Sequence, residues 1–282
     1  MARKNKNIII TIILACFCIA SVAYSFRMHN VVQALKAENQ ELVDENIALN
    51  IDLEQARLDA QVPPINGNSK QPKFAYLTFD DGPSHNTERI LDILKNYGVK
   101  ATFFVIGTES EYGKHLYRRI VEEGHAIGLH SYNHVYADIY QSEDAFMNSM
   151  YKLRDLIEET TGVRPDILRF PGGSNNSFAK KYGGPNLAAN LVERIHREGM
   201  QYFDWNVSSM DATAPVVSSQ VITAASLAGA RNCDQAIILM HDAPAKTTTV
   251  EALPAIIEGL QAQGFTFEVL KRDTPPAHFR LP

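Results

Sequence analysis

Cysteine is scarce in this 282-residue chain. The three cysteines are Cys16, Cys18 and Cys233, and the first two lie inside an apolar run near the N-terminus. With one cysteine in the rest of the sequence, an intradomain disulfide framework and a cysteine-based zinc cluster are both excluded. Proteins also work in oxidising compartments without disulfides, so this count leaves the compartment open.

An excess of positive charge is also lacking. The 27 Lys and Arg residues are outnumbered by 32 Asp and Glu residues, which gives a formal net charge of −5. A nucleic-acid-binding face needs clustered Lys and Arg to neutralise phosphates, so nucleic acid is not expected as a partner. The length and the 45% hydrophobic content predict one medium-sized globular domain with an appendage.

Charged residues are absent from residues 8–26, which follow a short basic tail at residues 1–7. An uncharged run of this length is just long enough to cross the hydrocarbon core as a helix. Basic residues on its N-terminal side predict a cytoplasmic N-terminus and an extracytoplasmic remainder. We expect an uncleaved single-pass membrane anchor. Two alternatives also export the chain: cleavage as a signal peptide near residues 21–23, which gives a secreted protein, and lipidation at Cys16.

Glycine and proline are absent from the segment after this run, and residues 27–61 are expected to form a helical stalk. Leu35, Leu42 and Leu49 recur every seven residues. The partner positions of this heptad hold Val32, Asn39, Asn46 and Leu53. Leucine at d with asparagine at a is typical of a parallel two-stranded coiled coil, which predicts a homodimer through the stalk. The alternative is a solvated single-helix spacer, because the run covers only about four heptads.

Short apolar runs alternate with longer helical patterns in the rest of the chain. We expect a linker at residues 62–72, a globular domain at 73–271 and a C-terminal tail at 272–282. Strand-like runs lie at residues 74–79, 101–106, 126–129, 167–170, 201–207, 236–240 and 265–270. Helical patterns lie between them at residues 87–97, 114–123, 143–161, 187–198, 216–230 and 250–263. This alternation predicts an α/β fold with a parallel sheet that can close as a barrel.

Reactive side chains follow the predicted strands. Asp80 and Asp81 come directly after the first strand, and His130 and His134 follow the third. Residues at or just past the next three strand ends are Arg169, Trp205 and His241. In parallel α/β proteins the carboxyl ends of the strands form the site, so we expect all these side chains at one rim.

Each of these residues alone has an ordinary structural explanation, but together they indicate metal chemistry. Adjacent carboxylates such as Asp80 and Asp81 repel each other unless a cation compensates. Two imidazoles four residues apart, with one carboxylate, form a ligand set suited to Zn²⁺, Co²⁺ or Fe²⁺. His241 is a candidate general acid, because the pKa of histidine lies near working pH.

Two further features support a site at this rim. Arg169 is too costly to bury alone, so we expect it to pair with a carboxylate such as Asp80. The glycines at 172 and 173 allow a backbone N–H to approach a developing oxyanion closely. We expect residues 174–186 to line the substrate groove, while residues 178–182 and the remaining histidines receive a structural interpretation.

Four motifs in this order resemble the polysaccharide deacetylase family with the NodB homology domain, carbohydrate esterase family 4. They are Thr78-Phe79-Asp80-Asp81-Gly82-Pro83, His130-Ser131-Tyr132-Asn133-His134, Arg169-Phe170-Pro171-Gly172-Gly173 and Leu239-Met240-His241. The resemblance covers roughly residues 73–270. It implies a distorted (β/α) barrel with about seven strands, which agrees with the strand count above.

The resemblance also implies roles for individual residues. Asp80 would be the general base and His241 the general acid, with Arg169 orienting Asp80. The metal would be Zn²⁺, with Co²⁺, Mn²⁺ or Fe²⁺ as alternatives, and its ligands would be Asp81, His130 and His134. The Gly172 N–H would help to bind the oxyanion, and Leu239 and Trp205 would shape the acetyl pocket.

The fourth family motif, D-x-x-D-W, is only partly present. The segment from Gln201 to Trp205 keeps only the last two residues, and a shifted register would place Ser208 at the position that supports the catalytic histidine. The first carboxylate is missing in both registers. Serine, Asp204 or Asp211 is therefore left to orient the general acid.

The function implied is a metal-dependent N-deacetylase of cell-envelope glycan, most of all of N-acetylglucosamine or N-acetylmuramic acid in peptidoglycan. A deacetylase of another polymer, such as an exopolysaccharide, chitin or xylan, is the second hypothesis. A catalytically impaired envelope-binding module that keeps the fold is the third.

Overall fold

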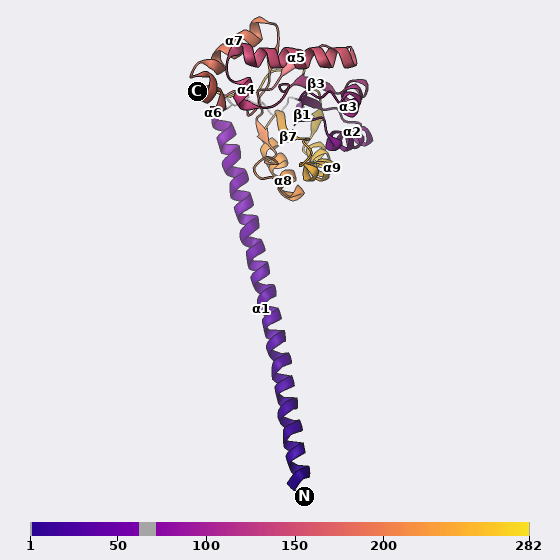
Figure 1. The fold of residues 1–282 in the computed structure, drawn as a ribbon, viewed down its shortest axis with the longest axis vertical. Coiled ribbons are helices and arrows are strands. Elements are labelled where there is room, and N and C mark those ends of the chain that lie inside the picture. The colour runs from indigo at the N-terminus through magenta and orange to yellow at the C-terminus, as the bar shows by residue number, and fades with distance from the viewer. Residues whose placement is uncertain (1, 62–71, 282) are drawn as a thin grey trace. The chain divides into compact units, whose positions relative to one another are not determined.

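The computed structural model describes residues 2–61 and 72–281, with side chains described from residue 26 onward apart from a few in the first helix (Figure 1). The chain forms two compact units, Met1–Asn50 and Ile51–Pro282. The predicted linker at residues 62–72 lies, apart from its last residue, outside the described residues.

The first unit is the greater part of helix α1 (Ala2–Gln61). Its heptad leucines Leu35, Leu42 and Leu49 are 58%, 51% and 61% exposed. In the described part of the chain, no helix has both the length and the apolar content that a membrane span requires. The side chains of nearly all of the predicted anchor at residues 8–26 lie outside the description, so the anchor stays a prediction, as does pairing of the stalk.

The second unit is built on one sheet in which every described strand pairing is parallel. Its path runs β5-β4-β3-β2-β1-β7-β6, and β8 pairs with the first residues of β1. The strands are β1 (Lys73–Asp80), β2 (Thr102–Val105), β3 (Ala126–Leu129), β4 (Ile167–Leu168), β5 (Gln201–Tyr202), β6 (Val207–Ser208), β7 (Gln235–His241) and β8 (Phe265–Phe267). The parallel α/β prediction is confirmed, as an open, curled barrel.

One predicted strand, residues 201–207, is wrong as a single element. β5 pairs with β4, whereas β6 pairs with β7 at the opposite end of the path. Between them, Asp204 N–H donates to Ala277 O at 2.9 Å and Asn206 N–H donates to Ile237 O at 3.2 Å. The apolar run therefore leaves one end of the sheet and crosses to the other, bridging the gap in the barrel.

Helices surround the sheet in the same order as the strands they connect (Figure 1). Neighbouring helices pack in the order α7, α5, α3, α2, α9 and α8. The helices are α2 (His85–Tyr97), α3 (Glu111–Glu122), α4 (Tyr136–Ile139), α5 (Glu143–Thr161), α6 (Ser177–Gly183), α7 (Leu187–Arg197), α8 (Ser219–Ala230) and α9 (Thr247–Ala262). Several begin at a serine whose side chain accepts a backbone N–H, such as Ser142 before α5, which is why they start there.

The two faces of β1 differ, because successive side chains on a strand point to opposite faces. Leu77 and Phe79 join the core under the helices. Thr78 and Asp80 therefore lie on the other, concave face, where Tyr76 packs in a smaller cluster. The pattern brings polar side chains to the inside of the curled sheet at its carboxyl ends.

Candidate active site

The three predicted metal ligands converge. Asp81 follows β1, and His130 and His134 follow β3, which is separated from β1 by β2 in the sheet. Asp81 Oδ1 lies 3.5 Å from His130 Nε2 and 3.2 Å from His134 Nε2. One ligand atom from each residue lies within 4.8 Å of the others. Asp81 and His134 both adopt left-handed backbone conformations, φ 74° and 53°, which non-glycine residues rarely hold without compensation.

The hydrogen bonds and burial of these groups fit a cation. His130 Nδ1 donates to the Arg169 carbonyl at 2.9 Å, so its Nε2 carries a lone pair. Burial lowers the pKa of His130 to about 3, and the ring is neutral. Asp81 Oδ1 is buried and accepts no hydrogen bond from the described residues. Two acceptors facing each other at 3.5 Å repel unless a positive ion lies between them, so these residues suit a divalent metal.

Asp80 is held on the same rim by a buried arginine. Arg169 has 0% exposure and donates through NH1 to Asp80 Oδ1 at 2.9 Å and to Thr78 Oγ1 at 2.7 Å. Its other nitrogens donate to the carbonyls of Phe203 and Asp204. The predicted pairing of Arg169 with Asp80 is confirmed, and every nitrogen of this buried cation has a hydrogen-bond acceptor.

The second oxygen of Asp80 faces the metal ligands. Asp80 Oδ2 lies 3.8 Å from His130 Nε2, while Arg169 occupies Oδ1. Burial raises the pKa of Asp80, and the charges of Arg169 and His241 oppose that shift without cancelling it. The carboxylate is therefore a stronger base than an exposed aspartate, with one oxygen directed at the site.

His241 lies at the end of β7, in register with Asp80 on β1. Its Nδ1–H donates to Asp211 Oδ1 at 2.8 Å, and its backbone N–H donates to Asp211 Oδ2 at 2.7 Å. Burial disfavours the imidazolium, but the adjacent Asp211 carboxylate outweighs it and raises the pKa of His241 to about 9. Among the three candidates left by the sequence, Asp211 is the residue that orients the histidine.

The other two candidates have different roles. Asp204 accepts from the N–H and hydroxyl of Ser174 at 2.8 Å and 2.6 Å, and from Phe279 N–H at 2.8 Å. It therefore joins the loop after β4 to the C-terminal segment. Ser208 accepts from Met210 N–H, within its own turn.

The three residues predicted to contact substrate surround this rim. Leu239 is 8% exposed on β7, two residues before His241. Gly172 is exposed with φ +79°, in a turn closed by Gly173 N–H donating to Phe170 O. Trp205 packs edge-on against Phe279, with ring centroids 4.8 Å apart. A Cβ added at Gly173 would lie 3.2 Å from Trp205, so the indole lies beside the glycine turn.

Several supporting residues were not found from the sequence. Thr249 on α9 donates to Asp211 Oδ2 at 2.9 Å, and Lys246 Nζ donates to the Asp211 carbonyl at 2.7 Å. Asp242 is fully buried and accepts from Thr87 Oγ1 at 2.5 Å. For Asp242, the only indication in the sequence was its position directly after His241 of the Leu239-Met240-His241 motif.

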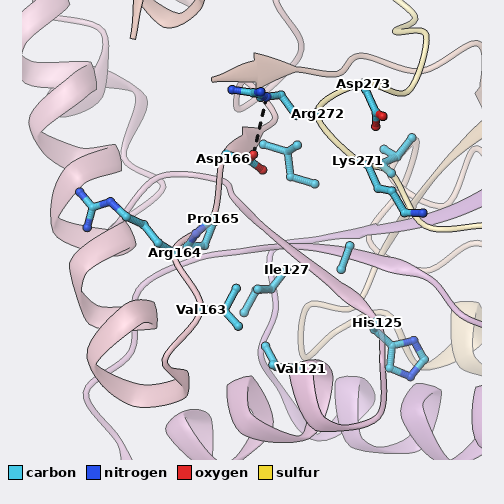
Figure 2. A pocket seen from close by; sticks show the side chains of 13 residues that line it. Val121, His125, Ile127, Val163, Arg164, Pro165, Asp166, Lys271, Arg272 and Asp273 are labelled. Atoms are coloured by element: carbon cyan, nitrogen blue, oxygen red, sulfur yellow. Dashed lines mark ion pairs between the residues drawn. The ribbon is translucent and has the colours of Figure 1, made fainter. Parts of the chain in front are cut away.

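A cavity lies away from these residues. It has a volume of about 490 Å³ and contains an Arg272–Asp166 ion pair of 3.9 Å (Figure 2). Its lining comes from residues just before β3 and β4, such as His125 and Pro165, and from residues after β8. It is therefore at the amino ends of these strands, and none of the predicted site residues lines it.

A parallel α/β domain in which three potential metal ligands lie beside a buried carboxylate and a histidine oriented by a carboxylate is typical of metal-assisted hydrolases. The family model described as polysaccharide deacetylase matches residues 67–184. A peptidoglycan-N-acetylglucosamine deacetylase of Bacillus cereus is 31% identical, over 97% of this chain and 94% of the relative. The chain belongs to the polysaccharide deacetylase family, whose members hydrolyse acetyl groups from polysaccharides.

Solved structures agree with the assignment. The catalytic domain of peptidoglycan N-acetylglucosamine deacetylase from Eubacterium rectale matches with TM-score 0.72 and 35% identity, over 78% of this chain and 98% of that domain. The polysaccharide deacetylase Bc1974 from Bacillus cereus matches with TM-score 0.64 and 33% identity, over 73% of this chain and 96% of that chain. The predicted family and barrel type are confirmed.

Proposed function

We propose that this enzyme removes N-acetyl groups from amino sugars of peptidoglycan. The observation that carries the proposal is the meeting of the Asp80–Arg169 and His241–Asp211 pairs at one rim with the metal-ligand set. The names of the relatives from B. cereus and E. rectale support N-acetylglucosamine as the sugar. An exopolysaccharide, chitin or xylan is the alternative substrate.

Asp81, His130 and His134 would hold the divalent metal, with Zn²⁺ as the first choice and Co²⁺, Mn²⁺ or Fe²⁺ as alternatives. A bound ion supplies Lewis-acid polarisation of water and of the acetyl carbonyl. The hydrogen bond from His130 to the Arg169 carbonyl fixes the ring for this task and links the metal site to the base.

Asp80 takes a proton from the attacking water. Arg169 binds its Oδ1 and leaves Oδ2 facing the metal ligands, so the direction of proton transfer is set by the fold. Because burial raises its pKa, Asp80 holds that proton more strongly than an exposed carboxylate would.

His241 supplies the proton for the leaving group. As the carbon–nitrogen bond breaks, the sugar nitrogen takes this proton and leaves as a neutral amine. Without the proton it would have to leave as an amide anion, which is a very poor leaving group. Asp211 holds the imidazolium in orientation. The Gly172 N–H would donate to the oxyanion, with Leu239 and Trp205 shaping the pocket for the acetyl methyl group.

The test compares two neighbouring carboxylates. Asp80→Asn should abolish acetate release, by at least about 100-fold, while the protein still binds one equivalent of zinc. Asp81→Asn should lose both metal and turnover, because it removes a ligand. Acetate is measured enzymatically and zinc by atomic emission. If Asp80→Asn releases acetate at the wild-type rate, the base assignment is wrong.

Purified peptidoglycan, chitin oligomers and acetylated xylan serve as parallel substrates in this assay. We expect the highest kcat/KM on peptidoglycan. A clear preference for xylan would show an O-deacetylase and contradict the N-acetyl proposal, whereas a preference for chitin oligomers would change only the polymer.

We further propose a membrane location with the catalytic domain outside the cytoplasm. The uncharged run at residues 8–26, preceded by basic residues, supports an anchor. The exposed heptad leucines of α1 support a parallel dimer through the stalk.

A further inference from the structure

Tyr136 lies beside the metal ligands but was not predicted to take part in the chemistry. It begins the short helix α4, two residues after His134, and its ring is half-buried. The His134 ring meets it edge-on at 5.2 Å between centroids, and the Phe178 ring stacks on it at 4.3 Å with 12° between the planes. Tyr140 lies nearly parallel at 6.2 Å. The ring is therefore fixed from several directions.

The hydroxyl of Tyr136 is directed toward the glycine turn after β4. A Cβ added at Gly172 would lie 3.3 Å from Tyr136 Oη and 3.5 Å from its Cε1. Any side chain at position 172 would therefore crowd the phenol. Glycine is required there for a second reason, because φ +79° is the left-handed conformation of a tight turn.

Two hydrogen-bond donors thus lie close together at the glycine turn. The turn from Phe170 to Gly173 is closed by the Gly173 N–H, which leaves the Gly172 N–H outside that bond. Among the described residues, neither the Gly172 N–H nor the Tyr136 hydroxyl has a hydrogen-bond partner. Gly172 is exposed and Tyr136 is half-buried, so neither residue is sealed off from a substrate.

We propose that the Tyr136 hydroxyl is a catalytic residue, a second donor to the oxyanion that forms on the acetyl oxygen. This inference rests on the proposed deacetylation. When the water oxygen bonds to the carbonyl carbon, the carbonyl electron pair moves to oxygen, which accepts hydrogen bonds from Tyr136 O–H and Gly172 N–H. When the carbon–nitrogen bond breaks, that pair re-forms the carbonyl of acetate and the nitrogen takes its proton from His241. The phenol keeps its own proton throughout.

The ordinary alternative is that Tyr136 only packs against Phe178. The two explanations differ in what they require of the hydroxyl. Packing depends on the ring alone, which phenylalanine retains, whereas donation depends on the oxygen, which phenylalanine lacks. Tyr136→Phe therefore separates them.

The experiment compares Tyr136→Phe with Tyr97→Phe in the full-length, zinc-loaded enzyme. Tyr97 is the control, because it is the last residue of α2, outside the site, and its hydroxyl donates to Glu258. We expect Tyr136→Phe to lower kcat by at least about tenfold with KM within twofold, in line with loss of one oxyanion donor. Tyr97→Phe should match wild type in kcat and KM. Zinc content and melting temperature should be the same in all three proteins.

A second readout follows the oxyanion directly. A methylphosphonamidate of glucosamine carries a tetrahedral, negatively charged group in place of the acetamide. In Tyr136→Phe its inhibition constant should rise by the same factor by which kcat/KM falls, while the inhibition constant of acetate should not change. A structural role would move both constants or neither.

The outcomes are separable from the proposed function. If kcat of Tyr136→Phe falls less than tenfold, or if only KM rises, the inference is overturned while deacetylation stands. If wild type releases no acetate from any glycan, the proposed function fails, and 4-nitrophenyl acetate, which forms the same oxyanion, still tests Tyr136. A tenfold loss on that ester supports the donor role, and an unchanged rate refutes it.

Discussion

At the scale of single residues, the environments of Asp80 and His241 differ in the sign of the neighbouring charge. Both groups are buried, which disfavours the charged form of each. For Asp80, burial exceeds the attraction of Arg169, and the pKa rises. For His241, the Asp211 carboxylate exceeds burial, and the pKa rises to about 9. A more basic carboxylate and an imidazole that is protonated at neutral pH are what a base and an acid require on opposite sides of one amide.

The alkaline limit of activity should follow from this arrangement. Because catalysis needs protonated His241, kcat/KM should fall as the pH rises through about 9. Asp211→Asn removes the charge that raises this pKa, so the alkaline fall of kcat/KM should begin at lower pH. At pH 9, kcat/KM of this variant should be at least about tenfold below that of wild type. Ser208→Ala, at the alternative supporting position, should leave the profile unchanged. An Asp211→Asn profile that overlays wild type would show that another group sets the alkaline limit.

At the scale of elements, the turn from β1 into α2 is packed against the end of β7. A Cβ added at Gly82 would lie 2.2 Å from Asp242 Oδ2, closer than any real contact allows. Ser84 caps α2 and also donates to the Asp242 carbonyl at 2.5 Å. Asp81, the proposed metal ligand next to Gly82, is thus positioned where the β1–α2 turn packs tightly against the end of β7.

Gly82→Ala should therefore disturb both stability and the metal site. We expect the free energy of unfolding to fall by about 2–4 kcal/mol, because the methyl group must displace a buried carboxylate. Zinc affinity should weaken in parallel, since Asp81 is the adjacent residue. Urea denaturation and zinc titration measure the two effects.

Gly162→Ala is the matched control. Gly162 ends α5 with φ +75° and open space around it, so alanine there adds backbone strain of about 1 kcal/mol and no clash. Zinc affinity should stay at the wild-type value. Equal losses in the free energy of unfolding for the two substitutions would show that the clash with Asp242 does not add to the destabilisation.

Helices with a clear apolar periodicity could be predicted from the sequence, and helices too short to show one could not. The predicted helix at 143–161 has the observed bounds of α5, because nineteen residues show the apolar repeat and a serine cap. α4 and α6 have four and seven residues, too few for periodicity to be visible. The strand at 201–207 was misjudged because apolar content cannot show that a chain changes partners partway along it.

The candidate site was predictable to a similar degree. Asp81 and His130 could be placed because each lies next to a strand end, and parallel strands bring those ends together. Asp211 could only be one of three candidates, because the turn that carries it has no period and includes Met210 at φ +61°. Tyr136 and Phe178 come together only through tertiary packing of two short helices, which nothing in their sequence spacing encodes.

At the scale of the whole molecule, the proposed base, acid and metal ligands all lie between Asp80 and His241 in the second unit. None of the residues to which we assign a chemical role belongs to the first unit, so its exposed apolar heptad needs another explanation. Leucines that remain more than half exposed on an isolated helix are stabilised when a second helix covers them. The asparagines at a, which cost stability, would set a parallel register.

The full chain should be a membrane-bound dimer whose activity does not depend on dimerisation. The protein should sediment with membranes after an alkaline carbonate wash. After extraction in mild detergent, analytical ultracentrifugation should show a dimer. The triple substitution Leu35→Ser, Leu42→Ser and Leu49→Ser should give a monomer, because it removes the apolar seam. Ala34→Ser with Ala48→Ser, on the outer side of the heptad, should remain a dimer. Acetate release per chain should be the same in all three proteins, since the proposed ligands, base and acid all come from one chain. A wild-type monomer would instead establish the stalk as a single-helix spacer, and a chain released by carbonate would refute the anchor.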